Sequence, residues 1–115
     1  MLAYIARIDA SSLEVVKDKE VTNVSFEELA EELPEDSPRY IVLSYRYTHA
    51  DGHVSYPLVY IYYKPETAAT RALMLYASTL QHFGREGGLA TPYTLTHADM
   101  LTQSWLEDNL NKFAS

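Results

Sequence analysis

The sequence predicts an α+β domain in which helices cover a mixed central sheet. Three observations support this fold class: segments of alternating apolar residues, a capping-box spacing, and one long amphipathic segment followed by glycines. The chain has 115 residues, which is too few for two separate cores, so we expect a single domain over residues 1–115. The expected order of elements is ββαββαβα.

The first part of the chain predicts a β-hairpin and a short helix. Leu2–Asp9 and Leu13–Lys17 are rich in alternating or β-branched apolar residues, which favours two paired strands. Ser25 followed by Glu28 has the spacing of a capping box, and Pro34 ends the helix that it opens. That helix is short and acidic.

The middle of the chain predicts the two central strands of the sheet. Arg39–Tyr47 alternates with large side chains on both faces, and Val54–Tyr63 is strongly β-prone. Asp51 and Gly52 supply a tight turn between them, because glycine accepts a positive φ. Pro57 cannot donate to a ladder, so we expect it at an edge, at a bulge or at the start of the strand.

A long helix is predicted from the turn at Pro65 to about Phe83, with glycines at 84, 87 and 88 ending it. At 100° per residue, one arc should face the sheet: Ala69, Leu73, Tyr76, Ala77, Leu80 and Phe83. The opposite arc consists of Arg71, Met74, Leu75, Ser78 and His82. Two large apolar side chains beside a cation are typical of a protein interface. The alternative is that another element of the same domain covers them.

The last part of the chain predicts a strand and a closing helix. Thr91–Leu95 is the expected strand, and the helix should begin between Thr96 and Thr102. Its apolar stripe, suited to lying on a sheet, consists of Leu101, Trp105, Leu106, Leu110 and Phe113.

Composition and charge argue against several partners. The formal net charge is -7 and the pI is about 4.9, so the chain offers no basic stripe for nucleic acid or for an anionic membrane. There is no cysteine, which excludes a thiolate nucleophile or a sulfur-based zinc site. No apolar run has the length of a signal peptide or membrane span, so we expect a cytoplasmic protein.

The histidines are the main alternative to a binding role. His49 and His53 flank the predicted turn, and imidazole is a common base and metal ligand. No His-Glu motif, nucleophile elbow or phosphate loop accompanies them, so we expect no metal, no cofactor and no enzymatic activity. A hydrolase or metal enzyme built on these two residues would require convergent ligands and a concave pocket.

Several sequence blocks from about Val21 onward share a pattern with one known family. The blocks are Glu32-Leu33-Pro34, Ser37-Pro38-Arg39-Tyr40-Ile41-Val42, Ser44-Tyr45-Arg46-Tyr47, His49, Asp51-Gly52 with Val54-Ser55-Tyr56-Pro57-Leu58, Pro65, Met74 with Tyr76-Ala77, and Leu101-Thr102 with Trp105-Leu106 and Leu110. In these blocks the chain resembles the glia maturation factors, which belong to the actin-depolymerising-factor homology (cofilin-like) class.

The resemblance implies a sheet sandwiched by helices and a long helix that docks on an actin-related protein. Cofilin-like members carry basic residues where this chain has Leu73 and Leu80, and only Arg71 remains basic. Weaker electrostatic steering toward actin fits a partner other than bare actin. The implied partner is the actin-related protein 2/3 complex, with debranching of filaments and inhibition of branch nucleation at cortical actin patches. The alternative is cofilin-like filament binding and severing.

The resemblance also implies a second surface that faces the filament. In one respect the sequence differs from the family pattern. The second surface would consist of His49, Asp51, His53, Ser55, Glu107, Asp108 and Asn111. The family has a helix before its first strand, and this chain begins close to that strand, so we expect that helix to be absent. Without it, part of an apolar sheet face should be bare.

Overall fold

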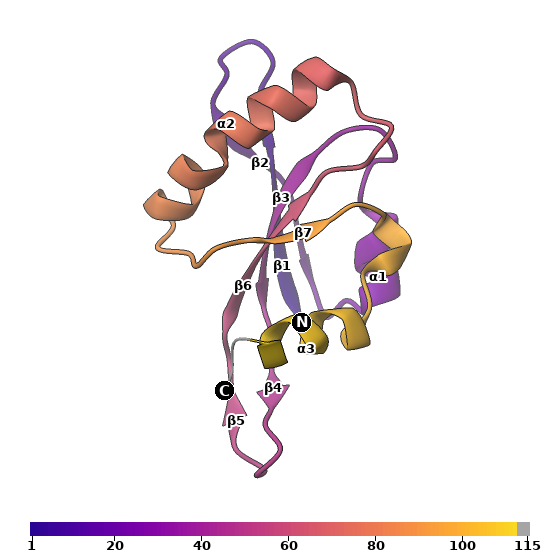
Figure 1. Cartoon of the computed structure of the whole chain (residues 1–115), viewed down its shortest axis with the longest axis vertical. Coiled ribbons are helices and arrows are strands. Elements are labelled where there is room, and N and C mark those ends of the chain that lie inside the picture. The colour runs from indigo at the N-terminus through magenta and orange to yellow at the C-terminus, as the bar shows by residue number, and fades with distance from the viewer. Residues whose placement is uncertain (113–115) are drawn as a thin grey trace.

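A five-stranded mixed sheet forms the middle layer of the molecule (Figure 1). The structure is a computed structural model of the chain, and residues 1–112 are described. The strands lie in the order β2-β1-β3-β6-β7, in which only the β6–β7 pair is parallel. Their bounds are β1 Leu2–Ile8, β2 Val15–Thr22, β3 Arg39–Ser44, β6 Leu58–Tyr63 and β7 Tyr93–Leu95. The predicted mixed sheet is confirmed.

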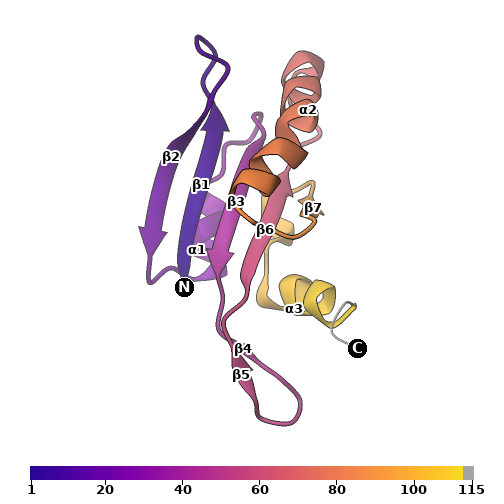
Figure 2. The ribbon, with the colours of Figure 1, turned by 90° about the vertical axis from the view of Figure 1, so that its left-hand side faces the viewer.

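Helices cover both faces of this sheet. α2 (Thr70–Glu86) packs on one face, where six buried residues of the sheet and helix form a cluster rich in tyrosine. The other face packs against α1 (Phe26–Glu31), the short 3-10 helix Ala98–Met100 and α3 (Gln103–Lys112). Figure 2 shows these two layers on either side of the sheet. Within residues 1–112, no helix is long and apolar enough to cross a lipid bilayer.

The capping box at the start of α1 is present as predicted. The Glu28 backbone N–H donates to Ser25 Oγ over 3.1 Å, and the Ser25 backbone N–H donates to Glu28 Oε1 over 3.1 Å. These two bonds satisfy donors that the first turn of a helix otherwise leaves unpaired. Leu29 is then buried against the sheet, which fixes a helix of only six residues.

The two central strands are each interrupted, which the sequence did not indicate. β4 (Tyr47–Thr48) and β5 (Val54–Ser55) form a separate hairpin beyond β3 and β6. Pro57 lies just before β6, one of the places expected for it, and its carbonyl accepts a bond from the Tyr45 N–H over 3.2 Å. The missing proline N–H ends the ladder there. Gly52 has a φ of 90° at the hairpin tip, as the turn prediction requires.

The bounds predicted for the long helix are wrong at both ends. α2 begins at Thr70, after a turn in which the Ala68 N–H bonds the Pro65 carbonyl, and it continues to Glu86. Gly84 does not end it, because this glycine lies inside the helix where a Cβ would be 3.1 Å from Tyr60 Cε2. Its role is therefore close packing, and Gly87 is the C-cap.

The closing helix lies on the sheet largely as predicted. Leu101 and Leu106 are buried in the cluster that includes α1, and Trp105 and Leu110 pack against it. The Thr102 hydroxyl accepts a bond from the Trp105 N–H over 3.1 Å, which caps the start of α3. Phe113, the last member of the predicted stripe, lies outside the described residues.

Part of the face that carries α2 is open to solvent. Leu2, Ser44 and Leu58 lie side by side in the register of β1, β3 and β6, and Leu58 is 60% exposed. Tyr4 and Val42 in the adjacent row are half-buried. Figure 2 shows β1, β2 and the lower part of β3 beside α2 with no helix over them. Within the described part of the chain, this strip of the sheet is therefore exposed.

We predict that Gly84→Ala lowers the free energy of unfolding by about 1–3 kcal/mol, as overpacking of a core typically does. Tyr60 cannot give way easily, because its hydroxyl bonds the Leu80 carbonyl and its ring contacts Tyr40 and Phe83. Urea unfolding followed by circular dichroism measures the change. The control is Gln81→Ala in the same helix, which should shift stability by less than about 0.5 kcal/mol. A Gly84→Ala protein as stable as wild type would contradict the close-packing role.

Candidate protein interface

Three hydrogen bonds fix the orientation of α2 on the sheet. The Ile8 N–H donates to Tyr76 Oη over 2.9 Å, and the Tyr40 hydroxyl donates to the Tyr76 carbonyl over 2.5 Å. The Tyr60 hydroxyl donates to the Leu80 carbonyl over 2.9 Å. Each bond joins a strand to the helix, so α2 cannot rotate without breaking them.

The tyrosine rings add close packing to these bonds. Tyr40 stacks on Phe83 with ring centroids 5.0 Å apart and lies 5.2 Å from the ring of Tyr76. Burial raises the pKa of Tyr40 and of Tyr60 well above that of an exposed phenol. Both hydroxyls therefore stay protonated and remain donors at any physiological pH. The helix is held by interactions that pH does not disturb.

The side of α2 away from the sheet is exposed. This agrees with the prediction from residue spacing for four of the five residues on the outward arc. Arg71, Ser78 and His82 are exposed, and Met74 is 68% exposed. The Ser78 hydroxyl donates to the Leu75 carbonyl over 2.8 Å, and His82 Nε2 lies 3.1 Å from Glu86 Oε1. A methionine this exposed on a helix is a ready contact for a partner.

Three residues of the long helix do not lie where the wheel placed them. Leu75, predicted outward, is half-buried and packs against the tyrosine cluster. Ala69 and Ala77, predicted to face the sheet, are exposed. The residues of α2 that face the sheet are centred on Tyr76 and Phe83, and Leu75 lies at the border of this face. The hydrogen bonds of Tyr76 to the sheet set this rotation of the helix about its axis. Leu75 thus borders the exposed side and is not part of it.

Two residues of the exposed side were missed by the sequence reading. Gln81 and Arg85 are exposed, and they follow Met74 at i+7 and i+11, so the same periodicity contains them. Arg85 was missed because the helix was expected to end at Phe83, whereas Gln81 lies within the predicted helix and was simply not included in the outward arc. We define the outer face of α2 as Arg71, Met74, Ser78, Gln81, His82 and Arg85.

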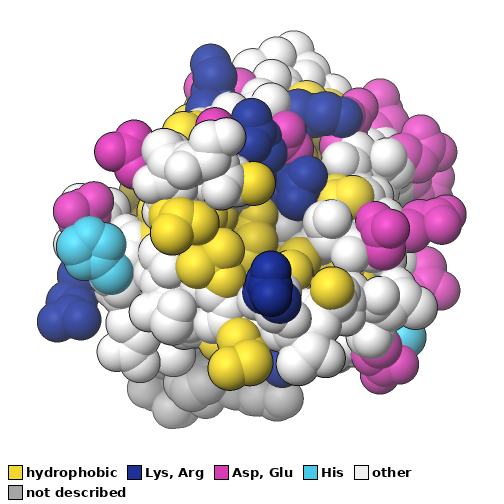
Figure 3. All heavy atoms as spheres, turned by 90° about the horizontal axis from the view of Figure 1, so that it is seen from above, with side chains coloured by type: hydrophobic (Ala, Val, Ile, Leu, Met, Phe, Trp, Pro, Cys, Tyr) yellow, Lys and Arg dark blue, Asp and Glu magenta, His cyan; other side chains and the backbone are white. Residues whose placement is uncertain are grey.

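The outer face carries positive charge in an acidic protein. Within residues 1–112, neither Arg71 nor Arg85 forms an ion pair, so both guanidinium groups are available to a partner. Figure 3 looks onto the upper end of the molecule, where hydrophobic side chains gather in the middle among Lys and Arg side chains. Asp and Glu side chains are densest along the right-hand edge of that view. Other Asp and Glu side chains lie among the cations in the upper part of the view.

The residues predicted for a second surface fall into two groups. His49, Asp51, His53 and Ser55 belong to the β4–β5 hairpin, where His49 Nε2 lies 2.9 Å from Ser55 Oγ and the His53 N–H bonds Asp51 Oδ1 over 2.9 Å. Glu107, Asp108 and Asn111 belong to α3. Figure 1 shows the hairpin extending from the sheet at the end where α3 lies.

Two tyrosines connect these groups. The Tyr45 hydroxyl donates to Glu107 Oε2 over 2.7 Å, and the Tyr47 hydroxyl bonds Asn111 Oδ1. The ring of Tyr47 also lies 4.5 Å from that of His49. Burial, and then the Glu107 carboxylate, raise the pKa of Tyr45, so its hydroxyl remains a donor. The hairpin and α3 thus form one connected surface.

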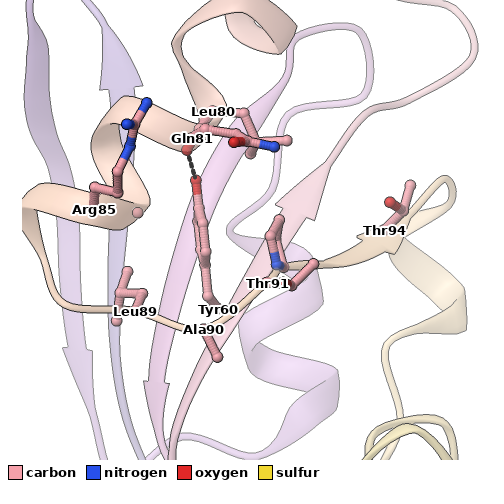
Figure 4. Close-up of a pocket in the computed structure, with 10 residues that line it drawn as sticks. Tyr60, Leu80, Gln81, Arg85, Leu89, Ala90, Thr91 and Thr94 are labelled. Atoms are coloured by element: carbon pink, nitrogen blue, oxygen red, sulfur yellow. Dashed lines mark hydrogen bonds between the residues drawn. The ribbon is translucent and has the colours of Figure 1, made fainter.

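A cavity of about 430 Å³ lies between the C-terminal half of α2 and residues 89–94 (Figure 4). Tyr60 runs along it, with Gln81 and Arg85 on the helix and Thr91 and Thr94 on the segment that follows. Neither His49 nor His53 lines it, and their rings lie 5.3 Å apart on the hairpin. Residues 1–112 hold no group of three His, Asp or Glu side chains that could bind a metal ion. The two histidines therefore lie outside this cavity.

The layered fold and an exposed, rigidly held long helix define an actin-depolymerising-factor homology domain. A family model described as cofilin/tropomyosin-type actin-binding protein matches residues 3–111, so the chain belongs to this family of actin-binding proteins. The crystal structure of a cofilin from Streptomyces griseoflavus superimposes with a TM-score of 0.82 at 22% identity, over 96% of this chain and 82% of that one.

Within the family, several of the similar proteins are glia maturation factors. The chain is 39% identical to glia maturation factor beta of Mus musculus over 111 residues, which is 96% of this chain and 78% of the relative. It is 34% identical to glia maturation factor of Drosophila melanogaster, over 94% of this chain and 78% of the relative. The solution structure of glia maturation factor from Caenorhabditis elegans has a TM-score of 0.79 at 33% identity, over 93% of this chain and 78% of that one. The resemblance found in the sequence is confirmed.

We predict that Tyr45 and Glu107 are energetically coupled, since their bond joins α3 to the sheet. In a double-mutant cycle with Tyr45→Phe and Glu107→Ala, the coupling free energy should be about 1 kcal/mol. Urea unfolding of the four proteins gives the value. The control cycle pairs Tyr45→Phe with Asp108→Ala, which should be additive. Additivity in the first cycle as well would show that the bond does not stabilise this surface.

Proposed function

We propose that the chain binds the actin-related protein 2/3 complex at branch junctions, promotes debranching of actin filaments and inhibits new branch nucleation. Binding would be its whole activity, with no catalysis, cofactor or metal. The observation that carries the proposal is the outer face of α2, a firmly held helix on which Met74 lies between two arginines that form no ion pair within residues 1–112. A rigid face with an apolar centre and charged edges loses little entropy on binding.

The proposed choice of partner rests on family membership and on charge. Several of the similar proteins are glia maturation factors, and the resemblance implies that cofilin-like members are basic where this helix has Leu73 and Leu80. Fewer cations on the helix reduce the electrostatic steering toward acidic actin. This supports an actin-related subunit as the main partner, in a cytoplasmic setting at cortical actin patches.

The second surface would act on the filament side of the junction. The β4–β5 hairpin extends away from the sheet and is connected to α3 through hydrogen bonds of Tyr45 and Tyr47, so the two groups lie on one surface. A protein that contacts two subunits with different strength in two junction states shifts the equilibrium between those states. Cofilin-like filament binding and severing is the second candidate function, because the family model is that of actin-binding proteins.

Single-filament imaging of branched networks separates these functions. The protein is added to filaments grown with the actin-related protein 2/3 complex, and branch loss and severing are counted in the same field. Co-pelleting with unbranched filaments is measured in parallel. Faster branch loss without binding to unbranched filaments supports debranching. Severing of unbranched filaments, with branches lost only as filaments break, would replace it with the cofilin-like function.

We predict that Arg71→Ala combined with Met74→Ala weakens binding to the complex at least tenfold, a loss of more than about 1.4 kcal/mol. Both side chains are exposed, so the unfolding midpoint should stay unchanged. Fluorescence anisotropy with the labelled chain measures the affinity. The matched control, Lys64→Ala combined with Met100→Ala, removes the same two types of side chain elsewhere and should bind as wild type does. Equal affinity of both double variants would exclude α2 as the interface.

A further inference from the structure

The connection between β1 and β2 presents a leucine to solvent in a strained backbone conformation. Leu13 is 60% exposed and has a φ of 59°, in the left-handed region that residues with a Cβ rarely occupy. Both features cost free energy, since an exposed leucine gains nothing from burial and glycine or asparagine would relieve the backbone. Strain of this kind is concentrated at functional positions.

The loop that carries Leu13 is held in one shape by its own hydrogen bonds. Asp9 Oδ1 accepts from the Ser11 N–H over 2.8 Å and from the Ser12 N–H over 3.2 Å. The Leu13 N–H bonds the Asp9 carbonyl over 2.8 Å, and the Asp9 N–H bonds the Glu14 carbonyl over 2.8 Å. The two serine N–H groups also hold the pKa of Asp9 below its usual value. The leucine side chain is therefore presented on a preorganised turn.

The hairpin tip lies at the same end of the molecule as α2. In Figures 1 and 2 the β1–β2 connection projects at the upper end, beside the helix. At its base, Ile8 is in the tyrosine cluster, and Val15 and Leu75 pack against that cluster from the strand and from the helix. The Ile8 N–H is also the donor to Tyr76 Oη. One packed unit thus supports both Leu13 and the outer face of α2.

The cations near this end favour an acidic partner surface. The carboxylates beside them are Asp9, which is bonded within the turn, exposed Glu14 next to Leu13, and Glu86 beside His82. Lys17 on β2 is exposed, and Arg71 and Arg85 on α2 are unpaired within residues 1–112. Asp18 on the same hairpin is already neutralised, because its carboxylate lies 3.1 Å from Arg39 Nε and 3.7 Å from Arg7 Nε. Figure 3 shows hydrophobic side chains in the middle of this end with cations among them.

We infer that the hairpin tip is a second docking element for the partner that α2 binds. Leu13 inserts into an apolar depression of an acidic protein surface, next to the place where Met74 docks. The exposed side chain, the rigid turn, the shared packing with α2 and the complementary charge carry this inference, which rests on the proposed binding to the actin-related protein 2/3 complex. It extends the interface from one helix to a helix and a hairpin.

Leu13→Gly tests the inference, because glycine suits the left-handed backbone and removes only the side chain. We expect its midpoint of urea unfolding to equal or exceed that of wild type while affinity for the purified complex falls about tenfold. Leu13→Asn, which also tolerates this backbone, should give the same result. Met100→Ala removes an exposed apolar side chain from the opposite layer and should leave the affinity unchanged.

The arms of the experiment separate the two proposals. Wild-type affinity of both Leu13 variants, with the double variant of Arg71 and Met74 still defective, would overturn the hairpin contact and leave the α2 interface standing. Failure of wild type to bind either the complex or actin filaments would overturn both. The alternative occupant is a second copy of the chain, which analytical ultracentrifugation of wild type and Leu13→Gly would detect. If wild type forms a dimer that Leu13→Gly does not form, and both bind the partner equally well, the inference is also overturned.

Discussion

The contact between α2 and the sheet determines what this protein presents to its surroundings. Two tyrosine hydroxyls donate to carbonyls of the helix, and the hydroxyl of Tyr76 accepts a strand N–H, so helix and sheet exchange hydrogen bonds in both directions. The bonds lie within a cluster of stacked rings, where the low dielectric strengthens them. Because this contact fixes the rotation of the helix on the sheet, it also determines which residues of α2 are exposed.

The same contact explains how an acidic chain can offer a cationic surface. Several acidic residues, Glu27, Glu28, Glu31 and Glu32, lie in or next to α1, on the layer opposite α2. Arg71 and Arg85 belong to α2 and are exposed. Separation by the sheet keeps the unpaired arginines away from those carboxylates. The β1–β2 hairpin belongs to the α2 side through Ile8 and Val15, which places an exposed leucine beside those cations.

Local signals in the sequence predicted much of the fold. The capping box at Ser25, the turn at Gly52 and the amphipathic long helix each depend on neighbours in the chain, and each is present. Long-range contacts were not predictable in this way. Gly84 is read as a helix end unless Tyr60 is known to lie against it, and the side of Leu75 depends on how the tyrosine bonds rotate α2. For the outer face, four of the five predicted residues are exposed. Of the two residues that were missed, Arg85 follows from the true end of the helix, and Gln81 lies within the predicted helix.

The central claim is that the outer face of α2, and not the opposite layer, contacts the actin-related protein 2/3 complex. Uniform replacement of methionine by a photoreactive analogue tests it in one sample, because Met74 lies on that face and Met100 on the opposite layer, exposed to 68% and 43% respectively. Irradiation of the bound complex followed by mass spectrometry should give cross-links through position 74 and none through position 100. Cross-links through position 100 alone would contradict the account.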